Sequence, residues 1–319
     1  MQCGGDAANE WIEKTFPESI ARDSEGHLYP TWIDCCFANG DPSTPFGHYI
    51  EQQLQQVLNV YPELDGIFVD QLCYQAFDYA HQDGLSAKNG CAVYEYGASL
   101  EKQFRKFAKA LHDKNKLVLV NGAFDLECSL SADAIMSEGS DTIFATYRYL
   151  CIRRPMLIHE FPDNAFKAEC MLRSALLTAA GWSLGGSPST AYAKKVSSEA
   201  KKLYQQYLPL LEKLFGAEIL LEENPLDWEP KPLAAAEIFR SRKDRRKIYV
   251  SVLQNTGSLH SEIVIKIKVK NKNIQKLCCM TVKDPEWRQL AFQIEDAWLK
   301  LVLPNNFSAA LIELQGSID

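Results

Sequence analysis

Three acidic residues stand where a carboxylate could take part in chemistry, because each ends or closely follows a short apolar run. Asp70 comes directly after three apolar residues, Glu138 lies near the end of ADAIMSEG, and Glu160 near the end of PMLIHEF. Two carboxylates that face one cavity can act as acid and base, since burial and like charge keep one protonated while the other stays ionised. A helix N-cap or turn is the alternative for Asp70, and a surface loop is the alternative for Glu138.

Seven further residues lie in or just after predicted strands and could contact a substrate through aromatic rings, amides or carboxylates. They are Trp32, Asp34, Asn39, Tyr74, Asn121, His159 and Trp182. Packing or a turn is the alternative for each, because Trp and Tyr are also common in cores. The cluster Asp78, His81 and Asp83 matches no zinc or EF-hand spacing. We therefore expect neither a metal nor a cofactor.

Six short apolar runs are the predicted strands that position these residues. They occupy residues 28–37, 66–71, 116–122, 132–139, 155–161 and 181–186. Helical patterns lie between several of them, as in the spacing of Ile50, Leu54 and Leu58. Strands that alternate with helices predict a parallel sheet covered by helices, either an open doubly wound sheet or a closed eight-stranded barrel. Polar strand ends favour the α/β barrel, where chemistry gathers at those ends, and no glycine-rich nucleotide loop follows a strand.

The C-terminal part of the chain has a different pattern. Short segments rich in Val, Ile and Phe follow one another, separated by turn residues such as Asn-Thr-Gly and Pro-Asn-Asn. Regularly spaced strands of this kind predict an antiparallel β-sandwich. We therefore divide the chain into a partial (β/α) barrel, residues 1–221, and a C-terminal β-sandwich domain, residues 222–319.

Composition narrows the classes of partner. The chain has 319 residues, of which 46% are hydrophobic and 24% charged, as in an ordinary globular protein, and its net charge of −7 argues against a nucleic-acid partner. No apolar stretch is long enough to span a membrane, and no signal-peptide pattern opens the sequence. The ten cysteines form no C-x-x-C pair, so we expect buried free thiols.

The order of these patterns resembles the barrel-plus-β-domain glycoside hydrolases of the α-galactosidase and α-glucosidase type. The most specific stretch is DGIFVDQ followed by FDYAHQDGLS at 77–86. If GWSLGG at 181–186 is the eighth barrel strand, residues 66–71 form the fourth and residues 28–37 the third. The first two βα units would then be missing, so we expect an N-terminally truncated barrel with about six such units.

The resemblance implies a glycosidase that acts on an oligosaccharide, a polysaccharide or another glycoside. It implies that Asp70 is the nucleophile and Glu138 the acid/base of a retaining mechanism, although the family usually carries Asp at the second position. Glu160 is the rival catalytic carboxylate, because another group of barrel glycosidases has its nucleophilic Glu on strand seven. The Glu-for-Asp change and the missing strands leave a second reading open: a non-catalytic carbohydrate-binding protein or an inactive fragment.

Overall fold

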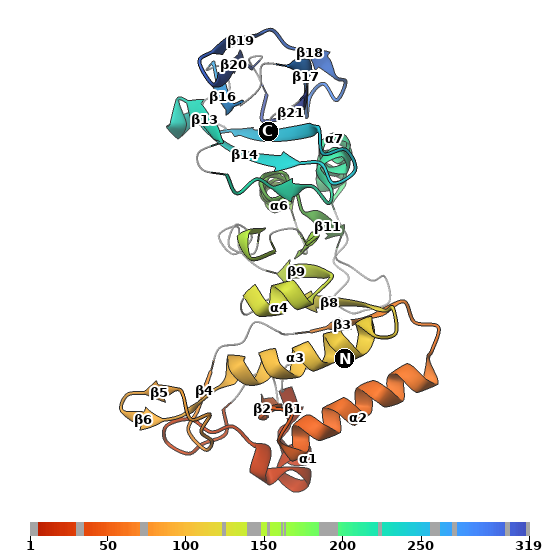
Figure 1. Ribbon diagram of the computed structural model, residues 1–319, viewed down its shortest axis with the longest axis vertical. Helices are drawn as coiled ribbons and strands as arrows, with labels where there is room; N and C mark the ends of the chain where they lie inside the picture. Colours follow the sequence, from red (N-terminus) through yellow and green to blue (C-terminus); the bar gives the residue numbers. More distant parts are fainter. Residues whose placement is uncertain are drawn as a thin grey trace. The chain divides into compact units, whose positions relative to one another are not determined.

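The structure, a computed structural model, describes most of the chain. The described residues are 6–29, 35–70, 76–122, 126–138, 148–151, 154–160, 162, 164–184, 197–222, 225–255, 262–269, 273–303 and 307–316. Trp32, Asp34 and Tyr74 therefore lie outside the described residues. The chain divides into two compact units, Met1–Met136 and Ser137–Asp319, and each has helices and strands of its own (Figure 1).

Parallel strands organise the first unit. β3 (Gly66–Val69) pairs with β8 (Leu117–Asn121), and β8 pairs with β9 (Ala134–Glu138), which continues past the unit boundary. Apolar side chains alternate along these strands, so one face is fully buried. Gly66 lets β3 and β8 approach closely, because a Cβ there would lie 2.3 Å from the carbonyl oxygen of Leu117.

Helices cover this part of the first unit. α2 (Pro45–Val60) starts at Thr44, whose hydroxyl oxygen accepts the Gly47 N–H, and it buries the apolar stripe predicted from its spacing. α3 (Tyr96–His112) packs against β8 and against α4 (Leu126–Ser131). The smaller elements are α1 (Asn9–Thr15), η1 (Pro17–Ser19), the antiparallel pair β1 (Asp6–Ala8) and β2 (Cys35–Phe37), the pair β4 (Phe77–Asp78) and β7 (Tyr94–Glu95), and the hairpin β5 (Ala87–Lys88) and β6 (Cys91–Ala92).

One strand differs from its prediction. We expected residues 28–37 to be the parallel barrel strand that precedes 66–71. The described part of that run contributes β2, which has three residues and pairs antiparallel with β1. Antiparallel partners engage this run instead: after β2, Ala38 forms an antiparallel bridge with Ile20, flanked by hydrogen bonds from the Asn39 N–H to the Ser19 carbonyl oxygen and from the Ala21 N–H to the Phe37 carbonyl oxygen.

The second unit begins with a parallel pair and two long helices. β10 (Met156–Glu160) and β11 (Gly181–Leu184) lie in parallel, and α6 (Ala165–Thr178) connects them. α6 starts at an Asn164 cap and ends at Ala179, which adopts the left-handed conformation. α7 (Ser198–Leu214) packs on α6 and accommodates Pro209 in its interior.

Two antiparallel sheets make up the rest of the second unit. The six-stranded sheet has the order β12-β14-β15-β21-β17-β18, and the four-stranded sheet has the order β13-β16-β20-β19. Their bounds are β12 (Glu218–Ile219), β13 (Leu226–Glu229), β14 (Ala234–Arg240), β15 (Lys247–Gln254), β16 (Val264–Lys268), β17 (Ile274–Thr281), β18 (Arg288–Gln289), β19 (Phe292–Glu295), β20 (Trp298–Val302) and β21 (Ala309–Gly316), with η2 (Lys231–Leu233) between β13 and β14. One hydrophobic cluster takes side chains from both sheets, among them Val250, Ile265, Leu299 and Ile312.

The mixed α/β class, with parallel strands followed by antiparallel ones, is confirmed. Among the described strands neither unit by itself closes a barrel, so the complete barrel stays a prediction. The predicted domain boundary at residue 221 falls inside the second unit, between β12 and β13, and β12 already belongs to the six-stranded antiparallel sheet. None of the helices in the described ranges has the length and apolar character needed to cross a bilayer.

Candidate active site

Asp70 and Asn121 meet at the carboxyl ends of two neighbouring parallel strands. Val69 of β3 lies in register with Val120 of β8, so each polar residue comes one position further along its strand. The Asn121 amide nitrogen Nδ2 donates a hydrogen bond of 2.7 Å to Oδ1 of Asp70. Two residues selected from the sequence therefore lie in direct contact, although they are far apart in the chain.

The alternation of side chains decides which face of the strands carries this pair. Val69 is fully buried, whereas Phe68, on the other face, is 39% exposed. Asp70 shares the face of Phe68, and Asn121 shares the face of Leu119, which is paired with Phe68. Both polar residues are half-buried. The carboxylate consequently lies on the more open face of the strands, where a ligand could reach it.

Glu138 ends β9, and its side chain is exposed. Met136 lies in register with Asn121, and Glu138 comes two residues later in the same strand. Residues two apart leave a strand on the same side, so Glu138 shares the face of Met136. Glu138 belongs to the second unit, whereas Asp70 and Asn121 belong to the first.

The remaining predicted residues with described backbone lie on β10, β11 and a turn. His159 and Glu160 are the last residues of β10, and Trp182 of β11 lies in register with Ile158. His159 is half-buried. Asn39 is almost fully buried, and its Oδ1 accepts the Asp41 N–H at 2.9 Å. This hydrogen bond is typical of a turn, the alternative given above for Asn39.

Two groups of polar side chains in the first unit that were not among the predicted site residues form several hydrogen bonds each. The buried Asp41 carboxylate accepts hydrogen bonds from Ser43, Tyr94 and Lys102. Burial acts to raise its pKa, but these hydrogen bonds outweigh burial and hold the pKa well below its usual range. The only local signal was the Asp-Pro-Ser-Thr-Pro turn, because the partners at positions 94 and 102 are distant in the chain.

The second group joins Asp78 and His81. The His81 ring nitrogen Nδ1 contacts Oδ2 of Asp78, and Nε2 lies 2.7 Å from the Glu18 carbonyl oxygen. Asp83 forms a separate set of hydrogen bonds: its carboxylate accepts the N–H groups of Leu85, Ser86 and Glu95. Within the described residues no three His, Cys, Asp or Glu side chains gather in a way that could hold a metal ion.

No family model and no curated protein matches this chain. Solved structures do match. The α-L-fucosidase isoenzyme 2 from Paenibacillus thiaminolyticus has a TM-score of 0.57 at 8% identity, over 97% of this chain and 86% of that one. A variant of the GH36 α-galactosidase AgaA from Geobacillus stearothermophilus, in complex with 1-deoxygalactonojirimycin, has a TM-score of 0.52 at 12% identity, over 96% of this chain and 42% of that one. The chain thus has a fold like that of glycoside hydrolases.

Proposed function

We propose that the protein is a glycoside hydrolase that cleaves O-glycosidic bonds with retention of configuration. The observation that carries the proposal is the Asp70 carboxylate, which follows a buried parallel strand and is held by the amide of Asn121 from the next strand. Chemistry in barrel enzymes gathers at the carboxyl ends of such strands. The solved structures with a similar fold are described as glycosidases, which supports the same reaction class.

Asp70 acts as the nucleophile in this mechanism. One carboxylate oxygen accepts the Asn121 N–H, which orients the carboxylate for attack. The carboxylate attacks the anomeric carbon, the bond to the leaving oxygen breaks, and a covalent glycosyl-enzyme ester forms. Water then hydrolyses this ester, which releases the sugar and restores the carboxylate.

Glu138 supplies the proton that the leaving oxygen needs. It donates this proton in the first step and, now ionised, takes a proton from the attacking water in the second. Its place as the last residue of a strand supports this role. Glu160 at the end of β10 is the second candidate for the acid/base, and Trp182 and His159 are the candidate contacts to the sugar.

We propose an oligosaccharide or another glycoside as the substrate. Two structures with a fold similar to this chain, at TM-scores of 0.51, are described as GH36 α-galactosidase variants in complex with raffinose and with stachyose. α-Linked galactosides are therefore the first substrates to try, followed by α-fucosides, because an α-L-fucosidase is among the similar structures.

The test is turnover of a panel of nitrophenyl α- and β-glycosides. We expect Asp70→Asn to lower kcat by about a thousandfold or more, because a nucleophile participates only in the reaction itself. Asp65→Asn, which changes an exposed Asp just before β3, is the matched control and should keep full activity. Unchanged turnover in Asp70→Asn would remove Asp70 from the mechanism.

The role of Glu138 needs its own comparison. In Glu138→Gln the rate should fall steeply for poor leaving groups and little for dinitrophenyl leaving groups, since the latter need no proton. Glu127→Gln, at an exposed position of α4, is the control. If Glu160→Gln gives this leaving-group dependence instead, Glu160 is the acid/base. Sugar binding without turnover of any substrate would replace the proposal with a non-catalytic binding protein.

A further inference from the structure

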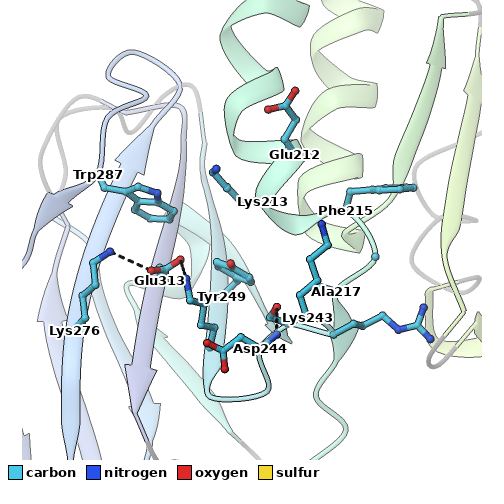
Figure 2. A pocket seen from close by; sticks show the side chains of 14 residues that line it. Glu212, Lys213, Phe215, Ala217, Lys243, Asp244, Tyr249, Lys276, Trp287 and Glu313 are labelled. Atoms are coloured by element: carbon cyan, nitrogen blue, oxygen red, sulfur yellow. Dashed lines mark hydrogen bonds and ion pairs between the residues drawn. The ribbon is translucent and has the colours of Figure 1, made fainter.

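A cavity of about 660 Å³ lies within the second unit, at the C-terminal end of α7 (Figure 2). Its wall is formed by the last turn of α7, the turn between β14 and β15, and the strands β15, β17 and β21, together with Trp287. A volume of this size is typical of sites for small molecules. The candidate active site uses none of these residues.

Strand register explains why polar groups gather on this wall. Glu313 of β21 lies directly between Tyr249 of β15 and Cys278 of β17. Side chains alternate between the two faces of a sheet. Because Ile248 and Ile312 point into the hydrophobic cluster shared by the two sheets, their neighbours Tyr249 and Glu313 point to the opposite face, where the cavity lies.

The buried Glu313 carboxylate is shared by two cations. It is only 3% exposed; Lys247 Nζ lies 3.4 Å from Oε2 and Lys276 Nζ lies 3.3 Å from Oε1. The Tyr249 hydroxyl also hydrogen-bonds to this carboxylate, and burial, followed by the Glu313 charge, raises the pKa of Tyr249 to about 12. One negative charge therefore faces two positive ones, which leaves an excess of positive charge at the base of the cavity.

Two more lysines add to this excess. Lys213 from α7 and Lys243 from the β14–β15 turn line the cavity, and neither has an ion-pair partner among the described residues. Figure 2 shows the carboxylate of Glu212, the acidic neighbour of Lys213, directed away from Glu313. Asp244, the other acid of the wall, pairs with Arg246. A partly enclosed cavity with this charge favours an anionic ligand.

Trp287 gives the cavity a flat apolar surface. The Lys276 ammonium lies 6.0 Å from the centroid of its ring, and the half-buried indole lines the same cavity as Glu313 (Figure 2). A flat aromatic ring packs well against the C–H face of a sugar, and carboxylate oxygens accept hydrogen bonds from hydroxyl groups. Together with the lysines, this set of groups suits a ring that carries both hydroxyls and a negative charge.

We propose that this cavity is a second carbohydrate-binding site, separate from the candidate active site, and that it takes an acidic saccharide. The acidic group lies between Lys213 and Lys243, a sugar ring packs on Trp287, and a ring hydroxyl donates to Glu313. The choice of a saccharide rests on the proposed function, whereas the preference for an anion rests on the lysines alone.

The test measures binding of trigalacturonic acid and of the neutral galactotriose by calorimetry. Full-length protein carrying Asp70→Asn is used, so that turnover does not interfere. We expect the acidic trisaccharide to bind at least about tenfold more tightly, as one or two charge-assisted contacts would give. Its affinity should fall with added salt, because salt screens these contacts, while the affinity of the neutral sugar should not.

Variants then assign the contacts. The double variant Lys213→Gln and Lys243→Gln should abolish the preference for the acidic sugar. The matched double variant Lys201→Gln and Lys283→Gln, at exposed lysines outside the cavity, should keep it. Trp287→Ala should weaken binding of both trisaccharides by about fivefold or more. Thermal unfolding of each variant shows whether the fold is retained.

Several results would overturn the proposal. Equal affinity for the two trisaccharides would exclude an acidic-sugar site. Equal losses of affinity in the two double lysine variants would exclude it as well. If inorganic sulfate displaces the trisaccharide and Trp287→Ala has no effect, the cavity binds only the anion. Failure of the proposed function is a separate result: Asp70→Asn would keep full hydrolytic activity while binding still followed Lys213 and Lys243.

Discussion

His81 has a hydrogen-bond acceptor at each ring nitrogen: the Asp78 carboxylate at Nδ1 and the Glu18 carbonyl at Nε2. Only the doubly protonated ring can donate to both. The hydrogen bond to Asp78 raises the pKa of His81 above its ordinary value, against the effect of burial. A raised pKa in the folded state stabilises the protein below about pH 6.5, the ordinary value. This stabilisation disappears as the pH rises through the folded-state pKa.

The free energy of unfolding should fall as the pH is raised above about 6.5, because the His81 stabilisation is lost. We expect this fall to be smaller in His81→Gln than in the unmodified protein. Urea unfolding curves collected at several pH values measure this difference. His48→Gln, an exposed histidine on α2, is the control and should leave the pH profile unchanged. A profile for His81→Gln that runs parallel to that of the unmodified protein would contradict the assignment.

At the scale of single elements, Gly66 sets the spacing of β3 and β8. A Cβ at this position would lie 2.3 Å from the Leu117 carbonyl oxygen, a backbone atom that moves only if the strands separate. We expect Gly66→Ala to lower the free energy of unfolding by about 1–3 kcal/mol, the usual cost of overpacking. It should also reduce hydrolytic activity, because Asp70 and Asn121 are positioned by these strands.

Gly40→Ala is the matched control for that substitution. Among the described residues, the new Cβ would meet Ile50 Cδ1 at 3.7 Å, an ordinary contact. Urea unfolding and turnover of the same nitrophenyl glycoside are measured for both variants. Equal stability of Gly66→Ala and Gly40→Ala would show that β3 and β8 tolerate a wider spacing than the structure has.

Arg173 ties α6 to the six-stranded sheet of the second unit. Its guanidinium donates to the Ser308 carbonyl oxygen at 3.1 Å and to the Gln254 carbonyl oxygen at 2.9 Å, beside the ends of β15 and β21. Arg173→Met keeps the aliphatic chain but removes both donors. Hydrogen bonds from a charged group contribute about 1.5–3 kcal/mol each, so we expect the loss of both to lower the free energy of unfolding by about 3–6 kcal/mol.

Lys201→Met, an exposed substitution on α7, is the reference for Arg173→Met because both changes replace a cation by the same side chain. In urea unfolding, Arg173→Met should be less stable than Lys201→Met by most of the expected loss in free energy. Closely similar midpoints would mean that water replaces the lost donors and that the contact to the sheet is dispensable.

Helices and strands with a regular pattern of apolar residues were predictable from the sequence, whereas contacts between elements distant in the chain were not. Apolar runs that end in a polar residue located β3, β8, β9 and β10, since buried parallel strands are continuously apolar. The same runs located Asp70 and Asn121 at strand ends, but the hydrogen bond between the two side chains was not predicted. The antiparallel pairing of β2 could not be foreseen, because its partners, β1 and the segment around Ile20, are distant in the chain.

The cavity beside Glu313 also could not be predicted from the sequence. Its charges come from five separate segments, and only the register between β15, β21 and β17 shows that Lys247, Lys276 and Glu313 share a face. In the sequence, the basic run RSRKDRRK at 240–247 is typical of a hairpin tip. In the structure, this turn joins β14 and β15, and part of it forms the wall of the cavity.

At the scale of the whole molecule, each compact unit has buried cysteines that can report its unfolding. Cys36 and Cys128 are buried in the first unit, and Cys151, Cys278 and Cys279 are buried in the second. Burial raises the pKa of Cys151 to about 11 and that of Cys279 to about 12, so these thiols carry little reactive thiolate at pH 8. Cys91 is exposed and should react with a thiol reagent in the native protein.

We expect the two units to be labelled at different urea concentrations. The second unit is longer and contains a hydrophobic cluster shared by two sheets, and the buried fraction of a unit rises with its size. Cys36 and Cys128 should therefore become reactive at lower urea than Cys279, as mass spectrometry of labelled peptides would show. Cys91→Ser provides the baseline by removing the native-state reaction at that site. Simultaneous labelling of all buried cysteines would mean that the two units unfold as one cooperative structure.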